Sequence, residues 1–450
     1  MIGRDIGSED VLDGPLHPAG RTGPSTSDEP DRVARHERTR LRRPRDYAAA
    51  LAVVVLAVAG VVAVAASSDE RATASRLASA PIPSPAPPDT FPPSLGEAWR
   101  ADSPATPDPV TAGPAVVTAA GSEVQGRDAV TGEVLWSYRR DLPLCTVTGA
   151  WSQAVAVYRN VKGWLPPDVP RGDGGCSEVT ALDGATGRRG PQRNSDAELG
   201  TRLISDGTYV TTTGTRLLTT WRSDLVLTME YGQVPDLVNA GRQPRAGCVY
   251  SSVAATPGRI GVIERCPDAA SDRLTVYKST AKDSDNPDVE LSIELGSTRA
   301  RVLALTGELT AVAVPGPARV LVFDPKGAQV GEYPMAVDDA DLATPPAGQV
   351  VPVARSAAAI YWFTGSDTVA LSPTDLSPQW TKQTTLGAGT VFGGRLLVPV
   401  ADGLDVLDPV TGESVGVIGV DRGDHRGPVT TSSIGTVVLE QRGDTLVALT

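Results

Sequence analysis

The chain has 450 residues, a formal net charge of -12, 4 cysteines and 3 histidines. This length allows one large domain or two to three smaller ones, and it is too long for a small disulfide scaffold. The negative charge removes the basic footprint that general nucleic-acid binders carry, so we expect no nucleic acid as a partner.

Residues 1–46 are rich in Gly, Pro, Ser, Asp and Arg and show no apolar periodicity. Such a segment buries too little surface to offset its chain entropy, so we expect a disordered tail. Its end, residues 32–45, is rich in arginine. A basic run of this kind can bind nucleic acid, but it can also flank a membrane span.

Residues 47–66 (YAAALAVVVLAVAGVVAVAA) are uncharged and almost wholly apolar. About 20 such residues cross a bilayer core as a helix, so the lipid bilayer is the expected partner of this segment. A buried core helix and a cleaved signal peptide are the alternatives, and Ala63-Val64-Ala65 resembles a cleavage site. The long tail and the long apolar stretch favour an uncleaved single-pass anchor. The preceding arginines place the N-terminus in the cytoplasm and residues 67–450 outside the cell membrane.

Residues 67–94 are dense in proline. Proline-rich chains are extended and semi-rigid, at about 3.1 Å per residue. The segment is therefore predicted to be an extracytoplasmic spacer that holds the following domain away from the membrane. A ligand for a Pro-recognition module is the alternative.

A short motif recurs after residue 95, with its clearest copies at DAVTGEVLW, DGATGRR and DPVTGESV. Glycine suits a tight turn with positive φ, the Asp side chain can accept hydrogen bonds from the turn amides, and an alternating strand follows. The motif residues are Asp128, Thr131, Gly132 and Trp136 in the first copy, Asp183, Thr186 and Gly187 in the second, and Asp408, Thr411 and Gly412 in the third.

Further predicted strands precede each motif. Together with the strand that follows the motif, they make a four-stranded antiparallel unit. Units of this kind that repeat along a chain predict an all-β fold, a β-propeller of about eight four-stranded blades over residues 95–450. Seven blades is the alternative, because the third and fifth units are degenerate. The last unit ends at Thr450 after three strands, and residues 95–101 (LGEAWRA) are predicted to supply the fourth and close the ring.

The motif resembles the D-x-x-T-G-x-x-x-W repeat of the PQQ-like family of β-propellers. The match is close from Asp128 to Trp136 and partial in the other two copies, where no Trp follows. The order of tail, span, spacer and propeller resembles uncharacterised actinobacterial single-pass membrane proteins. The propeller also resembles that of outer-membrane assembly lipoproteins, although no lipobox cysteine lies near residue 66.

The same resemblance bears on cofactors. True quinoprotein dehydrogenases of this family hold PQQ between a Trp and a disulfide of adjacent cysteines, beside a calcium ion. No two cysteines are adjacent in this chain. The resemblance therefore implies the fold without the quinone, and we expect no cofactor.

The four cysteines, Cys145, Cys176, Cys248 and Cys266, all lie in the domain expected outside the cell, where disulfides persist. The start of a first strand, the end of a second and the start of a third lie at one rim of a blade. Of the three possible connectivities, this favours Cys145–Cys176 and Cys248–Cys266. A metal–thiolate site is the alternative, but neither pair has C-x-x-C spacing.

No catalytic constellation stands out. After the tail, His425 is the sole histidine, in a loop with Asp421 and Asp424, and the sequence has no G-x-S-x-G elbow. The acidic stretches 283–288 (DSDNPD) and 338–341 (DDAD) lack the Gly and the distal Glu of a calcium loop. We expect no metal site, and calcium binding by these loops stays open.

These features predict a non-catalytic scaffold outside the cell, held by its anchor, that binds an unidentified envelope protein or polymer. The alternative is a sensor or enzyme that binds a ligand or quinone in the central channel. A third hypothesis is signalling through the basic tail.

Overall fold

The computed structural model describes residues 44–66, 72–88, 91–166, 174–235 and 241–450, which divide into a helical unit and a β unit at Ala66. The helical unit is α1 (Pro44–Ala66). Within the described residues, it is the one helix whose length and composition would allow it to cross a membrane. Most of the expected tail, including residues 32–43, lies outside the described residues.

The helix begins at Pro44, three residues earlier than the predicted boundary at 47. Proline is tolerated at the first helical position, where its missing N–H would have no partner in any case. Asp46 lies in the first turn, where a negative charge interacts favourably with the helix dipole. The predicted end of the tail at residue 46 was therefore wrong by one helical turn.

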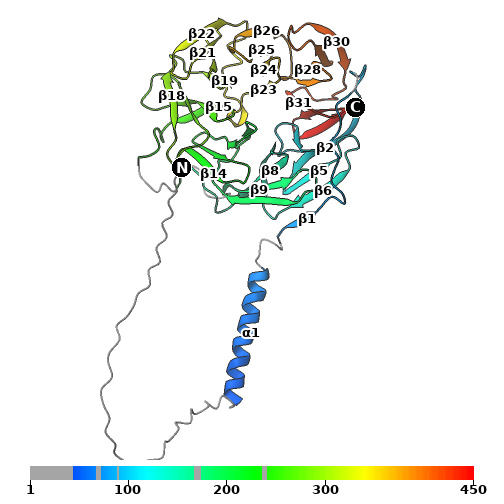
Figure 1. The fold of residues 1–450 in the computed structure, drawn as a ribbon, viewed down its shortest axis with the longest axis vertical. Coiled ribbons are helices and arrows are strands. Elements are labelled where there is room, and N and C mark those ends of the chain that lie inside the picture. The colour runs from blue at the N-terminus through cyan, green and yellow to red at the C-terminus, as the bar shows by residue number, and fades with distance from the viewer. Residues whose placement is uncertain (1–43, 67–71, 89–90, 167–173, 236–240) are drawn as a thin grey trace, which may run out of the picture. The chain divides into compact units, whose positions relative to one another are not determined.

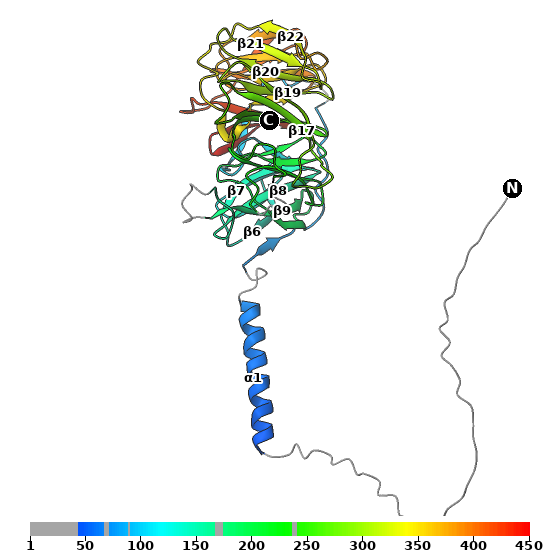
Figure 2. The same ribbon diagram turned by 90° about the vertical axis from the view of Figure 1, so that its left-hand side faces the viewer.

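The β unit is a propeller of eight antiparallel sheets (Figure 1). Seven sheets have four strands and the first has five, and four strands of each sheet form a blade. The prediction of eight blades is confirmed, and the seven-blade alternative was wrong. Figure 2 shows the same ring from its side. A single 3-10 turn, η1 (Ala347–Gln349), lies in the connection that enters the sixth blade.

The strands of each blade run from the ring axis outward. The first four blades are β3 (Val110–Ala112), β4 (Ala115–Ala120), β5 (Glu123–Arg127), β6 (Val134–Arg139); β7 (Leu144–Ala150), β8 (Gln153–Asn160), β9 (Gly175–Asp183), β10 (Arg189–Asn194); β11 (Leu203–Ser205), β12 (Val210–Thr212), β13 (Leu217–Trp221), β14 (Leu227–Gly232); and β15 (Val249–Thr256), β16 (Arg259–Arg265), β17 (Arg273–Lys278), β18 (Val289–Glu294).

The other four blades continue the same order. They are β19 (Arg301–Leu305), β20 (Thr310–Val314), β21 (Arg319–Phe323), β22 (Gln329–Pro334); β23 (Val353–Arg355), β24 (Ile360–Phe363), β25 (Thr368–Leu371), β26 (Pro378–Lys382); β27 (Thr390–Phe392), β28 (Arg395–Val400), β29 (Gly403–Leu407), β30 (Ser414–Gly419); and β31 (Val429–Ile434), β32 (Val437–Arg442), β33 (Thr445–Leu449), β2 (Glu97–Asp102).

The ring closes by joining the two ends of the propeller sequence. β2 pairs antiparallel with β33, so an N-terminal strand forms the outer edge of the C-terminal blade (Figure 1). Gly96 and Thr450 exchange two backbone hydrogen bonds of 2.9 Å beside this pair. β2 covers most of the stretch 95–101 that the sequence assigned to this position.

The core consists of eight separate apolar clusters, one between each pair of neighbouring blades. Blades five and six share one such cluster, and the last and first blades share another, which includes Leu439 and Val116. A single sheet cannot bury both of its faces alone, so each blade needs two neighbours. Closure of the ring therefore completes the eighth cluster.

The antiparallel order gives the propeller two different faces. Turns between the first and second strands and between the third and fourth strands lie on one face, which we call the turn face. Turns between the second and third strands, and the connections from blade to blade, lie on the other, which we call the loop face.

The proline-rich residues do not form the expected free spacer. β1 (Ala74–Arg76) pairs antiparallel with β6 and adds a fifth strand to the first blade. The backbone N–H groups of Ala78 and Ile82 then donate to the carbonyl oxygens of Thr186 and Ala185, at 3.0 and 3.3 Å. This contact lies on the turn face of the second blade.

The segment continues across the same face. Pro85 packs against the turn at Gly435 in blade eight, where an added Cβ would lie 2.5 Å from the proline Cβ. Phe91 meets Phe392 of blade seven edge to face, with ring centroids 6.4 Å apart. We call residues 77–88 and 91–95 the covering segment. The spacer prediction was wrong because the segment's apolar side chains can bury surface against the blade turns.

Candidate functional site

The repeat motif proves to be a contact between blades. Each D-x-x-T-G turn lies between the third and fourth strands of its blade, and its Asp side chain accepts hydrogen bonds from turn amides, as Asp128 does from Thr131 at 2.8 Å. The indole N–H of Trp136 in blade one donates to the Gly184 carbonyl of blade two at 2.8 Å. The motif therefore joins one blade to the next.

Trp99 and Trp380 make the same contact with their following blades. Their indole N–H groups donate to the carbonyl oxygens of Ala129 and Val410, at 2.9 and 3.0 Å. The turns of all three motif copies therefore receive the indole of the preceding blade, at Gly132, Gly187 and Gly412.

Both expected disulfides are present, Cys145–Cys176 and Cys248–Cys266, with Cα atoms 6.1 and 4.2 Å apart. All four cysteines lie at strand ends on the loop face. The first disulfide closes the base of the long turn between β8 and β9. The second holds the end of the β14–β15 connection.

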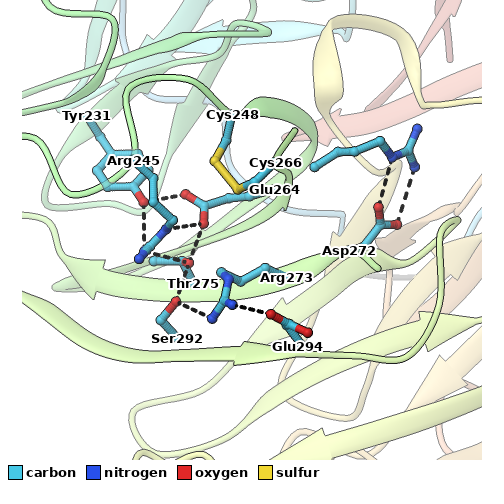
Figure 3. The surroundings of a disulfide bond; sticks show 11 residues. Tyr231, Arg245, Cys248, Glu264, Cys266, Asp272, Arg273, Thr275, Ser292 and Glu294 are labelled. Atoms are coloured by element: carbon cyan, nitrogen blue, oxygen red, sulfur yellow. Dashed lines mark hydrogen bonds and ion pairs between the residues drawn. A yellow bond between two sulfur atoms is a disulfide. The ribbon is translucent and has the colours of Figure 1, made fainter. Parts of the chain in front are cut away.

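A buried polar cluster lies beside the second disulfide (Figure 3). Glu264 is fully buried and accepts hydrogen bonds from Arg245 at 2.8 Å, from Thr275 at 2.7 Å and from the Tyr231 hydroxyl. Burial, followed by the neighbouring Glu264 carboxylate, raises the pKa of Tyr231. Because Arg245 precedes Cys248, the ion pair and the disulfide hold the same loop, which is a structural role.

The acidic stretch 283–288 forms ion pairs with neighbouring cations, and Asp341 of the second stretch accepts hydrogen bonds from hydroxyl groups. Arg242 contacts Asp283 at 3.1 Å and Asp285 at 3.0 Å, and Lys278 contacts Asp288 at 2.6 Å. Asp341 accepts hydrogen bonds from two side chains in blade six. Within the described ranges, no group of three or more His, Cys, Asp or Glu side chains could hold a metal ion.

The predicted solvated histidine has a local partner. A ring nitrogen of His425 lies 3.1 Å from the carbonyl oxygen of Pro428, within its own loop. Asp421 accepts a hydrogen bond from the Gly423 amide. The loop therefore satisfies its polar groups internally.

The loop face holds a cavity of about 870 Å³. Its wall includes residues from blades one, three, five, six, seven and eight, so it surrounds the ring axis. Ligand pockets for drug-sized molecules typically measure roughly 300–1,000 Å³. This cavity is the site with the size and the chemical variety to bind a ligand, and we call it the central cavity.

Two charged side chains in the central cavity were missed by the sequence reasoning. Asp108 stays exposed to solvent, although the cavity wall surrounds it on most sides. This enclosure raises the pKa of Asp108, against opposing effects from Arg202 and the Thr430 hydroxyl. The signal that could have identified Asp108 is its position between Pro107 and Pro109 in a connecting loop.

Arg202 enters the same cavity from the connection before blade three. Its aliphatic part lies against Gly348, where an added Cβ would come within 2.5 Å of the arginine Cγ. Gly348 has a φ of +59°, a conformation that favours glycine. In the part of the chain that the structure describes, no hydrogen bond or ion pair engages the Arg202 guanidinium.

Comparison with known proteins supports the fold class alone. No family model matches the chain, and no curated protein matches its sequence. The computationally designed Ika8 protein is 12% identical with a TM-score of 0.51, over 79% of this chain and 98% of that one.

Two natural structures are more distant. The quinohemoprotein alcohol dehydrogenase ADHIIG from Pseudomonas putida HK5 is 12% identical, with a TM-score of 0.46 over 79% of this chain and 76% of that one. Sqt1 from Saccharomyces cerevisiae is 10% identical, with a TM-score of 0.45 over 81% and 99%. The chain is a β-propeller, while membership of the PQQ-like repeat family and an actinobacterial source stay predictions.

Proposed function

We propose that this protein is a membrane-anchored, extracytoplasmic binding scaffold that contacts an envelope protein or polymer through its loop face. The observation that carries the proposal is the difference between the two faces. The covering segment occupies turns of blades two, seven and eight on the turn face. The loop face holds the central cavity and both disulfides.

General physics supports this choice of face. Loops held by a rigid scaffold are the usual carriers of binding function. Two of the longer connections on this face are tied by covalent bonds, which lowers the entropy lost when a partner binds. α1 supports the anchor, since its apolar side chains up to Val64 are exposed within its own unit.

The proposal is tested by photo-crosslinking in cells with the full chain. A photoreactive residue at Thr344, exposed on the cavity rim, should capture a partner. The matched control is the same residue at Lys326, exposed in a turn on the opposite face. Adducts from Lys326 with none from Thr344, or none from either, would contradict the proposal.

The alternative function is a sensor or enzyme that binds a ligand or quinone in the central channel. It is favoured by the size of the central cavity and by its charged side chains, Asp108 and Arg202 among them. The scaffold role that we propose assigns no catalytic residue.

A further inference from the structure

Two opposite charges that form no ion pair with each other line the central cavity. They are Asp108 and Arg202, and no ion pair joins them within the ranges that the structure describes. Arg301 and Asp341 line the cavity too, but Arg301 donates to the Leu342 carbonyl and Asp341 accepts hydrogen bonds from blade six. Gly348 supports the stem of Arg202. Asp108 and Arg202 therefore keep hydrogen-bonding capacity for a ligand.

The wall around these charges is mixed. Leu386, Val350 and Val353 are partly exposed apolar side chains of blades six and seven that line the cavity. A ligand that fits would carry a positive end, a negative end and some apolar surface between them.

We propose that the central cavity binds a short peptide with free termini, whose ammonium group contacts Asp108 and whose carboxylate contacts Arg202. Its side chains would lie against the apolar wall. This inference goes beyond the proposed scaffold role, because it needs only a cavity that is open to solvent.

The charges favour this class over simpler ligands. A lone anion would be attracted by Arg202 but repelled by Asp108. A lone cation would be attracted by Asp108 but repelled by Arg202. A neutral ligand would leave both charges without a partner while displacing their water, which costs free energy. A peptide with both charged ends satisfies the two groups together.

The experiment is a calorimetric titration of the detergent-solubilised full chain with tetra-alanine. Three probes are compared: the peptide with both termini free, the N-acetylated peptide and the C-amidated peptide. The free peptide should bind, and each blocked peptide should bind about tenfold or more weakly, because one charge-assisted contact is lost.

Two variants test which side chain contacts each end of the peptide. D108N should bind the free and the acetylated peptides equally, because it lacks the carboxylate that contacts the ammonium group. R202Q should bind the free and the amidated peptides equally. D424N and R426Q, which remove the same charges outside the cavity on the same face, should bind like the native chain.

Equal affinity for free and blocked peptides, or no binding of the free peptide, would overturn the inference. Unchanged discrimination in D108N and R202Q would do the same. Circular dichroism of each variant verifies that it is folded. A partner captured at Thr344 without peptide binding would leave the scaffold role standing and remove this inference alone.

Discussion

At the scale of single residues, the repeat motif matters because a glycine makes room for an indole. Gly187 has a φ of +74°, and a Cβ added there would lie 2.6 Å from the Cβ of Trp136. Gly132 and Gly412 accept Trp99 and Trp380 in the same way. At these positions glycine meets a conformational and a steric requirement together.

The first prediction concerns this contact. G187A should lower the free energy of unfolding by about 1–3 kcal/mol more than G258A does, because the new methyl group displaces Trp136. Gly258 is the matched control, with a φ of +84° and nothing within 4 Å of an added Cβ. Urea denaturation followed by tryptophan fluorescence gives both values. Equal losses would show that only the backbone conformation matters.

The motif also shows which contacts could be predicted from the sequence. The Asp, the Gly and the turn between them could be predicted, because they act within a few residues. The partner of Trp136 could not, because it lies in the next blade. The roles of Asp108 and Arg202 could not be predicted for the same reason, because blades far apart in sequence bring them to one cavity.

The second prediction is the pH dependence of peptide binding. Enclosure raises the pKa of Asp108, so its carboxylate gains a proton at a higher pH than an ordinary aspartate does. Peptide affinity should therefore fall as the pH is lowered through this pKa, before the peptide carboxylate itself titrates.

Calorimetry across the pH range measures this effect. Asp341 and Asp444 line the same cavity, so the comparison is with D108N, which should lack the step. A step of the same size in D108N would assign the pH dependence to another group.

At the scale of elements, the covering segment shows what a proline pattern leaves undetermined. Prolines fix φ and favour an extended chain, which the sequence revealed. They do not determine what the chain packs against. That depends on the shape of the turns at Gly435 and Gly393, which the fold brings beneath Pro85 and Phe91.

The third prediction follows from the two hydrogen bonds of this segment. The amides of Ala78 and Ile82 should exchange with deuterium much more slowly than unstructured amides, because both donate to blade two. Hydrogen exchange with mass spectrometry measures this in the full chain. Val161, exposed in the turn after β8, offers an exposed-loop reference. If the amides of Ala78 and Ile82 exchange at the rate of a free peptide, the prediction of a free spacer is correct after all.

At the scale of the whole molecule, stability comes from a closed ring of similar interfaces. The cluster between the last and first blades exists because β2 and β33 join the two ends of the sequence. The number of blades could be predicted because each blade repeats the same strand pattern. The difference between the two faces could not, because it depends on where the chain runs outside the repeats.

The last prediction concerns membrane topology under the proposed function. The arginines before α1 and the two disulfides in the propeller both predict that residues 67–450 lie outside the cytoplasm. All four native cysteines are paired, so an introduced cysteine is the sole free thiol. A membrane-impermeable maleimide added to intact cells should label E413C, in an exposed turn, and leave S27C unlabelled until the cells are permeabilised. Labelling of S27C alone in intact cells would reverse the orientation, and with it every role assigned to the loop face outside the cell.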